Sequence, residues 1–269
     1  MPEAFAMSTP EGPRLVTTPK NGVRMTQLSG KVALVTGASS GLGAAVAQLF
    51  AERGATVFGI ARDTARMSAV FESVPGGAFG AADITDPQAC RDAVQACVAR
   101  FGRLDVLVNA AGFHQMRHTA EVSDADWSYD LAANLSGPFY LCRAALPHLL
   151  DGGNIVNVAS VAGLEGEVYS AGYCAAKHGL VGLTRALAVE FTRERLRVNV
   201  VCPGGMLTPQ VTEFAAPEHA DYTLIMRIAA PRGLMEPRDV AAVIAFLASD
   251  DAAAIHGAVY AVDNGKLAG

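Results

Sequence analysis

Tyr173 and Lys177 stand four residues apart in the segment YCAAK, a spacing that places two side chains one turn apart on the same face of a helix. A phenol can act as an acid, but its ordinary pKa of about 10 makes it a poor base near neutral pH. An adjacent ammonium group lowers that pKa because it stabilises the phenolate. The pair could therefore be an acid with its activator, or an aromatic residue beside a surface charge, since this spacing arises by chance in many helices.

Ser160 and Asn134 are two further polar residues at positions that could serve a site. Ser160 directly follows the apolar run at residues 154–159, which we interpret as a buried strand. Ligands of open α/β sheets bind beyond the carboxyl ends of the strands, so Ser160 lies where a ligand is expected. Simpler roles stay open: Ser160 could end a strand, and Tyr173 could be a packing residue at a helix start. Asn134 could cap a helix kink near Pro138.

The segment TGASSGLG, residues 36–43, joins a predicted strand at 32–36 to the helix that follows. Gly37 permits a tight turn, Gly41 lets a pyrophosphate approach the backbone, and Gly43 lets the helix pack close to the sheet. The N-terminus of that helix presents unpaired N–H groups and a partial positive charge to phosphates. In this context a dinucleotide site is favoured over a plain turn.

The end of the second predicted strand, at residues 56–60, should meet the adenosine ribose of such a dinucleotide. An acidic residue there selects NAD, whereas a basic residue accommodates the 2′-phosphate of NADP. The sequence has Arg62 there, and Asp63 is the expected N-cap of the next helix, so we expect NADP(H) with Arg62 on the phosphate. Ser39 and Ser40 could add hydroxyl donors. The alternative is an exposed Arg62 with Asp63 turned inward.

Short apolar runs rich in Val and Ile alternate with segments of helical spacing from residue 30 onward. The runs predict strands at residues 32–36, 56–60, 78–82, 105–109, 154–159, 197–201 and 258–262. Helices are predicted between them, including 172–192, 237–249 and a long helix that Ser123 opens and Pro138 kinks. Strands buried on both faces and joined by helices form a parallel sheet. We therefore predict an α/β fold: a Rossmann-like, doubly wound sheet of about seven mainly parallel strands with helices on both faces.

One domain is expected, because no internal repeat or second boundary is visible. Residues 30–269 are predicted to form the dinucleotide-binding catalytic domain. Residues 1–29 contain several prolines and no periodicity, so we expect a flexible N-terminal arm. The irregular stretch at residues 203–235 is longer than a connection needs and is expected to be a substrate loop.

Composition argues against several classes of function. The chain of 269 residues is 51% hydrophobic and has a formal net charge of -5 without a long basic run, so no nucleic-acid partner is expected. The apolar run at 240–248 is too short to cross a membrane. Five cysteines without a Cys-x-x-Cys pair, and an N-terminus without the apolar core of a signal peptide, indicate a cytoplasmic setting. His114 and His118 lack nearby acidic or thiol ligands, so we interpret them as loop or surface histidines and expect no metal.

Taken in order, these motifs resemble the short-chain dehydrogenase/reductase family over about residues 30–265. The resemblance depends on TGASSGLG, NAAG at residues 109–112, Asn134, Ser160, YCAAK, and Pro203-Gly204 followed by Thr208. Two positions depart from the family pattern. The turn VDNG at residues 262–265 stands where two glycines are common, and Gly205 stands where many relatives carry a larger residue, which could widen the substrate pocket.

The resemblance implies an oxidoreductase that interconverts a ketone and a secondary alcohol by hydride transfer. Tyr173 would be the general acid and base, with a pKa lowered by Lys177 and the oxidised nicotinamide, and Ser160 would hold the substrate oxygen. Lys177 would also bind the nicotinamide ribose, and Asn134 would fix a water that links Lys177 to solvent. The implied cofactor contacts are Gly37, Ser39, Ser40, Gly41, Leu42, Gly43, Arg62, Asp83, Ile84, Asn109, Ala110, Ala111, Gly112, Tyr173, Lys177, Pro203, Gly204 and Thr208. Asp83 could instead be an N-cap.

The substrate pocket is expected to be mainly apolar. Its expected lining is residues 113–118 and 205–228, with Ala162 and Leu164, and the apolar candidates are Phe113, Met116, Met206, Leu207, Phe214 and Met226. A hydrophobic ketone or alcohol is therefore the expected substrate; a 3-oxoacyl thioester is a second candidate, with Arg117 at the entrance. The resemblance implies a homotetramer through helices near 125–150 and 172–192. Two alternatives stay open: an NAD(H)-dependent dehydrogenase of the same family, and a catalytically silent regulator that senses NADP(H).

Overall fold

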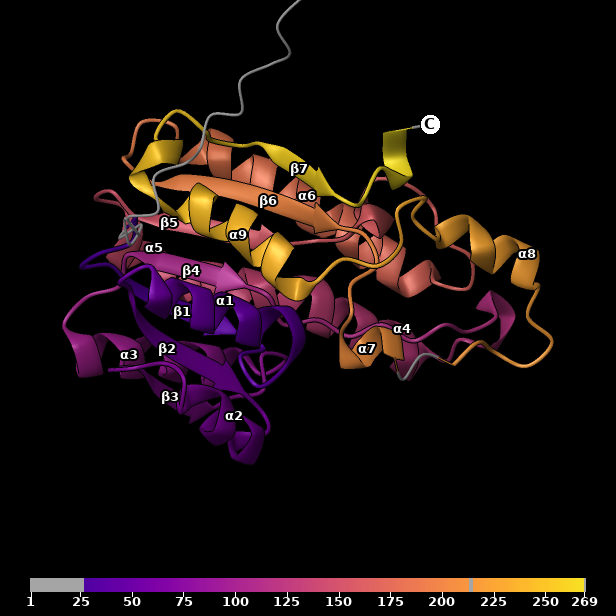
Figure 1. The fold of residues 1–269 in the computed structure, drawn as a ribbon, viewed down its shortest axis with the longest axis horizontal. Helices are drawn as coiled ribbons and strands as arrows, with labels where there is room; N and C mark the ends of the chain where they lie inside the picture. Colours follow the sequence, from indigo (N-terminus) through magenta and orange to yellow (C-terminus); the bar gives the residue numbers. More distant parts are fainter. Residues whose placement is uncertain (1–26, 213–214, 269) are drawn as a thin grey trace, which may run out of the picture.

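Seven parallel strands form one sheet in the computed structural model, which describes residues 27–212 and 215–268 (Figure 1). The strands are β1 Val32–Thr36, β2 Thr56–Ala61, β3 Ala78–Ala81, β4 Val106–Asn109, β5 Asn154–Val158, β6 Arg197–Pro203 and β7 Val259–Val262. Their order is β3-β2-β1-β4-β5-β6-β7, and every neighbouring pair is parallel. The chain therefore reverses its winding direction between β1 and β4, which is where doubly wound sheets bind ligands.

Helices cover both faces of this sheet, as the alternating pattern predicts. The longer helices are α1 Gly41–Glu52, α2 Thr64–Phe71, α3 Pro87–Phe101, α4 Asp124–Leu131, α5 Gly137–Leu149, α6 Ala171–Glu190 and α9 Pro237–Ala248; two short ones are α7 Pro209–Thr212 and α8 Tyr222–Ile225. Helices α1 and α9 pack together on one face, and α3 and α5 pack together on the other. Figure 1 shows α1 and α9 side by side against the strands.

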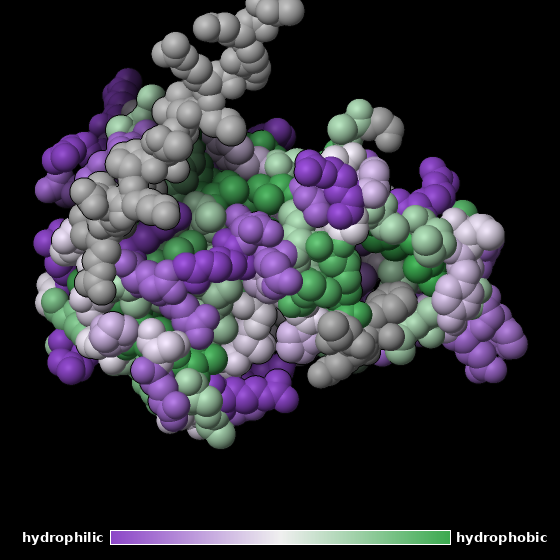
Figure 2. Space-filling view, viewed as in Figure 1, coloured by the Kyte–Doolittle hydropathy of each residue, from purple (hydrophilic) through white to green (hydrophobic). Residues whose placement is uncertain are grey.

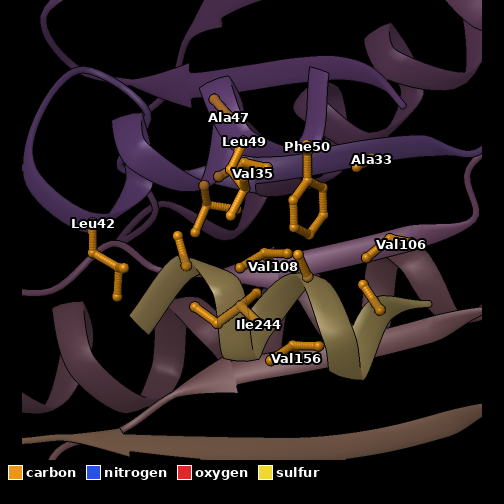
Figure 3. Close-up of a cluster of buried hydrophobic side chains, with 14 of the residues drawn as sticks. Ala33, Val35, Leu42, Ala47, Leu49, Phe50, Val106, Val108, Val156 and Ile244 are labelled. Atoms are coloured by element: carbon orange, nitrogen blue, oxygen red, sulfur yellow. The ribbon is translucent and has the colours of Figure 1, made fainter. Parts of the chain in front are cut away.

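The core on the α1–α9 side joins both helices to the centre of the sheet. Figure 3 shows Phe50 of α1 and Ile244 of α9 in one cluster with Val35, Val108 and Val156, which come from three adjacent strands. These side chains are buried, as are all residues of β1, β4 and β5. Complete burial of the central strands explains why their sequences are rich in Val, Ile, Leu and Ala rather than alternating between apolar and polar residues.

The predicted strand and helix bounds agree with the structure to within two residues, apart from the long helix after Ser123. Ser123 caps α4 through its predicted capping box with Asp126. The helix then passes through a π-helical turn at Ala132–Ser136 before α5 begins, and Pro138 lies in the first turn of α5. The prediction placed a kink at Pro138. The structure instead has its helical distortion just before this proline. The expected N-terminal arm lies almost entirely outside the described residues.

The segment at 203–235 carries more structure than the sequence suggested. It contains α7 and α8, and an isolated bridge pairs Met206 with Met235 at its two ends. Leu207 and Leu234 are 45% and 47% exposed. Figure 2 shows hydrophobic surface in this part of the molecule, between α9 and α8. Among the described residues, no helix is long and apolar enough to cross a membrane.

Candidate active site

A cavity of about 740 Å³ opens at the carboxyl edge of the sheet. Loops after six of the strands contribute to its wall, as expected for a doubly wound fold. The predicted site residues that line it are Gly37, Ser39, Ser40, Gly41, Leu42, Gly43, Arg62, Asp83, Ile84, Ala110, Ala111, Gly112, Ser160, Tyr173, Lys177, Pro203, Gly204 and Thr208. Asn109 and Asn134 are the two predicted site residues that do not line it.

The glycine turn has the backbone geometry that its sequence predicts. Gly37 and Gly41 have φ values of 68° and 53°, in a backbone region that residues other than glycine rarely adopt. A Cβ atom added to Gly43 would lie 2.2 Å from the carbonyl oxygen of Gly37. Gly43 therefore lets α1 begin directly against the end of β1, so that the first N–H groups of the helix face the cavity.

Ser160, Tyr173 and Lys177 converge at the end of β5. Tyr173 is only 9% exposed, and the Ser160 hydroxyl lies near enough to its phenol to oppose the rise in the phenol pKa. The Nζ atom of Lys177 lies 5.5 Å from the centre of the Tyr173 ring and donates a hydrogen bond to the carbonyl oxygen of Val158 at 2.9 Å. The loop between β5 and α6 packs closely against α6. A Cβ atom added to Gly163 of this loop would lie only 2.7 Å from the carbonyl oxygen of Lys177. The spacing in YCAAK thus does place both side chains at one site.

Burial controls the ionisation of this pair. Burial raises the pKa of Tyr173, and the Ser160 hydroxyl opposes that rise without cancelling it. Burial also lowers the pKa of Lys177 to about 8. The protein's own residues thus raise the pKa of Tyr173, chiefly because burial removes water from the phenolate.

Asn134 occupies the π-helical turn and braces the neighbouring loop. Its side chain donates to the carbonyl oxygens of Phe113 (2.8 Å) and Asp130 (3.0 Å), and its Oδ1 accepts from the N–H of Phe113 (3.0 Å). A Cβ atom on Gly112 would lie 3.2 Å from Asn134 Oδ1 and 3.5 Å from Lys177 Nζ, so the two side chains meet behind this glycine. Pro138 has no N–H, so the backbone carbonyl of Asn134 loses its ordinary α-helical donor. Such π-turns occur often at functional sites.

The residues after β2 bring both basic and acidic side chains to the cavity, since Arg62, Asp63 and Arg66 all line it. Asp63 is the N-cap of α2 and accepts a hydrogen bond from the N–H of Arg66 at 2.9 Å. Arg62 is exposed at the cavity, where its guanidinium donates to the Tyr129 hydroxyl at 3.1 Å. Arg66 also lines the cavity, although the sequence gave no reason to select it. Asp83 caps no helix; its carboxylate binds the backbone and hydroxyl of Thr85.

Asn109 is the predicted cofactor contact that the structure places elsewhere. It is 1% exposed, and its amide donates to Asn157 Oδ1 at 2.8 Å and contacts Cys142. It therefore links β4 to β5 inside the fold, because it is the last residue of the strand and its side chain turns away from the edge. Successive side chains of a strand point to opposite faces of the sheet, so the direction of the Asn109 side chain depends on where β4 ends. Sequence patterns locate the ends of strands only to within a few residues.

Sequence reasoning missed two polar residues of the cavity, His114 and Glu167. His114 is not a surface histidine: its ring stacks on Tyr173, and its Nε2 lies 2.8 Å from Ser170 Oγ. Burial lowers the pKa of His114 to about 4, and burial raises the pKa of Glu167 to about 7. Glu167 carried a weak signal in the sequence, as an acidic residue between Ser160 and Tyr173.

The expected apolar lining is met only in part. Phe113, Met116, Met206 and Met226 line the cavity, whereas Ala162, Leu164 and Leu207 do not. Phe214 lies outside the described residues. Within residues 27–212 and 215–268, no three His, Cys, Asp or Glu side chains gather as a metal site would require. His118 instead contacts the carbonyl oxygen of Glu218.

Comparison with known proteins fits this geometry. A family model described as enoyl-(acyl carrier protein) reductase matches residues 37–266. The match contains the glycine turn, Ser160 and the YCAAK segment. The chain belongs to the short-chain dehydrogenase/reductase family. Membership makes it an oxidoreductase that uses NAD(P), and related members act on ketones and alcohols.

Individual members of the family are similar along nearly their whole length. The chain is 37% identical to a 3-oxoacyl-(acyl-carrier-protein) reductase from Thermotoga maritima, covering 90% of this chain and 99% of the relative. It is 40% identical to meso-2,3-butanediol dehydrogenase from Serratia marcescens, covering 88% and 95% respectively. The crystal structure of a short-chain alcohol dehydrogenase from Sinorhizobium meliloti, described as putative, superposes with a TM-score of 0.83 at 37% identity, covering 91% of this chain and 99% of that chain.

Proposed function

We propose that this protein is an NADP(H)-dependent oxidoreductase that interconverts a ketone and a secondary alcohol, with Tyr173 as the general acid and base. The observation that carries the proposal is the buried Tyr173 phenol, beside Ser160 and close to Lys177, in one cavity with the glycine turn. Relatives named for D-threitol, meso-2,3-butanediol and cyclohexanol support an alcohol or ketone substrate without selecting one.

In the direction of reduction, bound NADPH supplies the hydride that reaches the carbonyl carbon. Ser160 holds the carbonyl oxygen by a hydrogen bond that strengthens as negative charge develops on it. Tyr173 donates its proton to the same oxygen, which completes the alcohol. The raised pKa of Tyr173 keeps the phenol protonated and ready for this step. The Lys177 ammonium then stabilises the phenolate until a proton returns from solvent.

The residues that hold the dinucleotide would be those of the glycine turn, with Arg62 and Arg66 on the 2′-phosphate. Two observations support this choice of NADP over NAD. Both guanidinium groups border the cavity beyond β2, and the Asp63 carboxylate is occupied at the N-cap of α2, where it accepts from the backbone. A phosphate would gain charge-assisted hydrogen bonds from arginine, whereas the Asp63 carboxylate, which also borders the cavity, is already engaged by the N–H and the guanidinium of Arg66.

Fluorescence titration with NADPH and NADH tests the cofactor assignment. We expect the unmodified protein to bind NADPH more tightly, and Arg62→Ala to weaken NADPH binding about 10- to 100-fold, the effect of losing one hydrogen bond to a charged group. NADH binding should change little. Arg195→Ala, at an arginine with an 80% exposed side chain far from the cavity, is the matched control. Tighter binding of NADH by the unmodified protein would establish the NAD(H)-dependent alternative.

Turnover on a panel of ketones tests the catalytic assignment against the alternative of a silent NADP(H) sensor. We expect NADPH oxidation with at least one ketone, and a loss of 10²- to 10⁴-fold in kcat for Tyr173→Phe, the range typical of general acid–base catalysis. NADPH binding by this variant should persist. A protein that binds NADPH but reduces no ketone would favour the sensor.

We also propose that the protein is a homotetramer assembled through α4, α5 and α6. Apolar side chains remain exposed on these helices, including Trp127 (42%), Phe139 (38%) and Val189 (75%). Their burial between subunits would remove them from water. Light scattering of the purified protein tests this directly, and Val189→Glu should shift the mass toward smaller species.

A further inference from the structure

Glu167 presents a carboxyl group that no other side chain neutralises. Its N–H donates to Cys174 Sγ at 3.3 Å, but within the described part of the chain its carboxylate oxygens have no hydrogen bond or ion pair. The side chain lines the cavity, and its partial burial raises the pKa of the carboxyl to about 7. A carboxylate at a cavity wall that no side chain of the described residues engages is free to accept a hydrogen bond from a bound ligand, so Glu167 offers a site for a donor.

The fold holds this carboxyl close to the reacting position. Glu167 lies in the loop from β5 to α6, six residues before Tyr173, and its charge raises the pKa of that phenol. The loop is pinned at both ends, by the close approach of Gly163 to α6 and by the contact with Cys174. Because Glu167 and Tyr173 line the same cavity, a substrate whose carbonyl oxygen is bound by Tyr173 can present a neighbouring group to Glu167.

His114 supplies a second acceptor in the same region. Ser170 Oγ lies 3.0 Å from the carbonyl oxygen of Val168 and 2.8 Å from His114 Nε2. Because a carbonyl can only accept, Ser170 donates its proton to Val168 and must accept one from His114. The proton of the neutral imidazole is thus on Nε2, and Nδ1 is left as an acceptor. The cavity beside Tyr173 is therefore rich in acceptors.

The electrostatic surroundings distinguish between two kinds of donor. Besides burial, the positive charges of Lys177 and Arg117 contribute to the lowered pKa of His114. A substrate ammonium would meet the same two charges and would be repelled. A neutral hydroxyl can donate to a carboxylate without that penalty, so a hydroxyl is the donor that suits Glu167.

We propose that Glu167 accepts a hydrogen bond from a substrate hydroxyl on the carbon next to the carbonyl, so that the enzyme prefers an α-hydroxy ketone, or the corresponding vicinal diol, to the plain ketone. This inference rests on the proposed function, because it takes the carbonyl to be held by Tyr173 and Ser160. It narrows the apolar substrate expected from the sequence to one that carries a second oxygen.

Two ketones that differ by one hydroxyl test the proposal: cyclohexanone and 2-hydroxycyclohexanone. With NADPH, we expect kcat/KM of the unmodified enzyme to be at least about tenfold higher for the hydroxy ketone, the effect of one hydrogen bond to a charged group. In Glu167→Leu this ratio should fall to about one, and in Glu167→Gln, which keeps an acceptor, it should lie between. Glu72→Leu, the same change at an exposed residue outside the cavity, should keep the original ratio. An equal preference in the unmodified enzyme and in Glu167→Leu would overturn the proposal.

Binding to the NADPH complex of Tyr173→Phe gives a readout that does not depend on turnover. By calorimetry, we expect the hydroxy ketone to bind about tenfold more tightly than cyclohexanone, and the preference to vanish in the double variant with Glu167→Leu. If this preference is found although the unmodified protein reduces neither ketone, the hydroxyl subsite stands and the proposed function fails. If both compounds bind equally while the unmodified protein reduces them, the proposed function stands and the subsite is refuted.

Discussion

The imidazole of His114 stacks on the phenol of Tyr173, with ring centroids 4.3 Å apart and an interplanar angle of 28°. The contact joins the loop after β4 to the first turn of α6. Since Ser170 orients the imidazole, the same contact holds the phenol against the cavity wall. The proposed acid is therefore positioned from both sides, by Ser160 at its hydroxyl and by His114 on its ring.

This stacking leads to a prediction on the pH dependence of activity. His114 has a pKa of about 4, so its ring is neutral from pH 5 upward and does not titrate in the working range. We expect His114→Phe, which keeps a stacked ring but loses the bond to Ser170, to lower kcat/KM for a plain ketone by up to about tenfold. The shape of the pH profile between pH 5 and 8 should not change. A limb near pH 6.5 in the unmodified enzyme that His114→Phe removes would show that the imidazole does titrate there.

Lys177 is predicted to reduce the stability of the fold while serving the site. Its ammonium is 3% exposed, and the fall in its pKa from 10.5 to about 8 corresponds to a cost on the order of 3 kcal/mol for keeping it charged. The hydrogen bond that Lys177 donates to the carbonyl oxygen of Val158 offsets this cost by about 1 kcal/mol of folding free energy. We therefore expect Lys177→Met to be inactive and more stable by about 1–2 kcal/mol at pH 7, as measured by urea unfolding.

The pH dependence of that difference provides the control. The folded protein releases the Lys177 proton at about pH 8, whereas the unfolded chain holds it until about 10.5. The cost is therefore fully present below pH 8 and is lost as the pH rises toward 10.5. The difference in the free energy of unfolding between Lys177→Met and the unmodified protein should therefore be smaller at pH 9.5 than at pH 7. An advantage that is the same at pH 7 and 9.5 would argue against a charge effect.

Tyr169 is predicted to hold α8, which contributes Ile225 to the cavity wall, in its observed position. Its hydroxyl accepts a hydrogen bond from the N–H of Asp221 at 2.8 Å, at the start of α8, and its ring contacts His118. Tyr169→Phe removes only the hydrogen bond, worth about 0.5–1.5 kcal/mol. We expect KM for ketones to rise about two- to tenfold with a smaller change in kcat, measured by steady-state kinetics. Tyr222→Phe is the control, because this tyrosine of α8 is 66% exposed; an equal effect of both variants would refute the assignment.

Gly43 and Gly182 are predicted to respond in opposite directions to replacement by alanine. A Cβ atom on Gly43 would collide with the carbonyl oxygen of Gly37, so Gly43→Ala should cost about 1–3 kcal/mol in the free energy of unfolding and weaken NADPH binding. Gly182 is helical, and nothing lies within 4 Å of its added Cβ, so Gly182→Ala should stabilise by about 0.5–1 kcal/mol. Chemical denaturation measures both. Equal stability of the two variants would contradict the close packing at the glycine turn.

The sequence by itself determined the parts of this protein that depend on local pattern. Buried runs at β1, β4 and β5 mark the central strands because both of their faces are covered. The glycines of the turn were recognisable because a positive φ and a close helix approach permit no other residue. Ser160 and the YCAAK segment were recognisable because they follow one another in the order typical of the short-chain dehydrogenase/reductase family.

Only the tertiary structure decided which groups meet across the sheet and how each is solvated. His114 lies far from Tyr173 in the chain, so its approach to the phenol depends on how the loop after β4 folds over the edge of the sheet. Glu167 is near Tyr173 in sequence, but whether its side chain enters the cavity depends on how the loop after β5 folds. The direction in which Asn109 points follows from the residue at which its strand ends. The pKa of Tyr173 rises because burial removes water from the phenolate, and burial results from packing that no local spacing encodes.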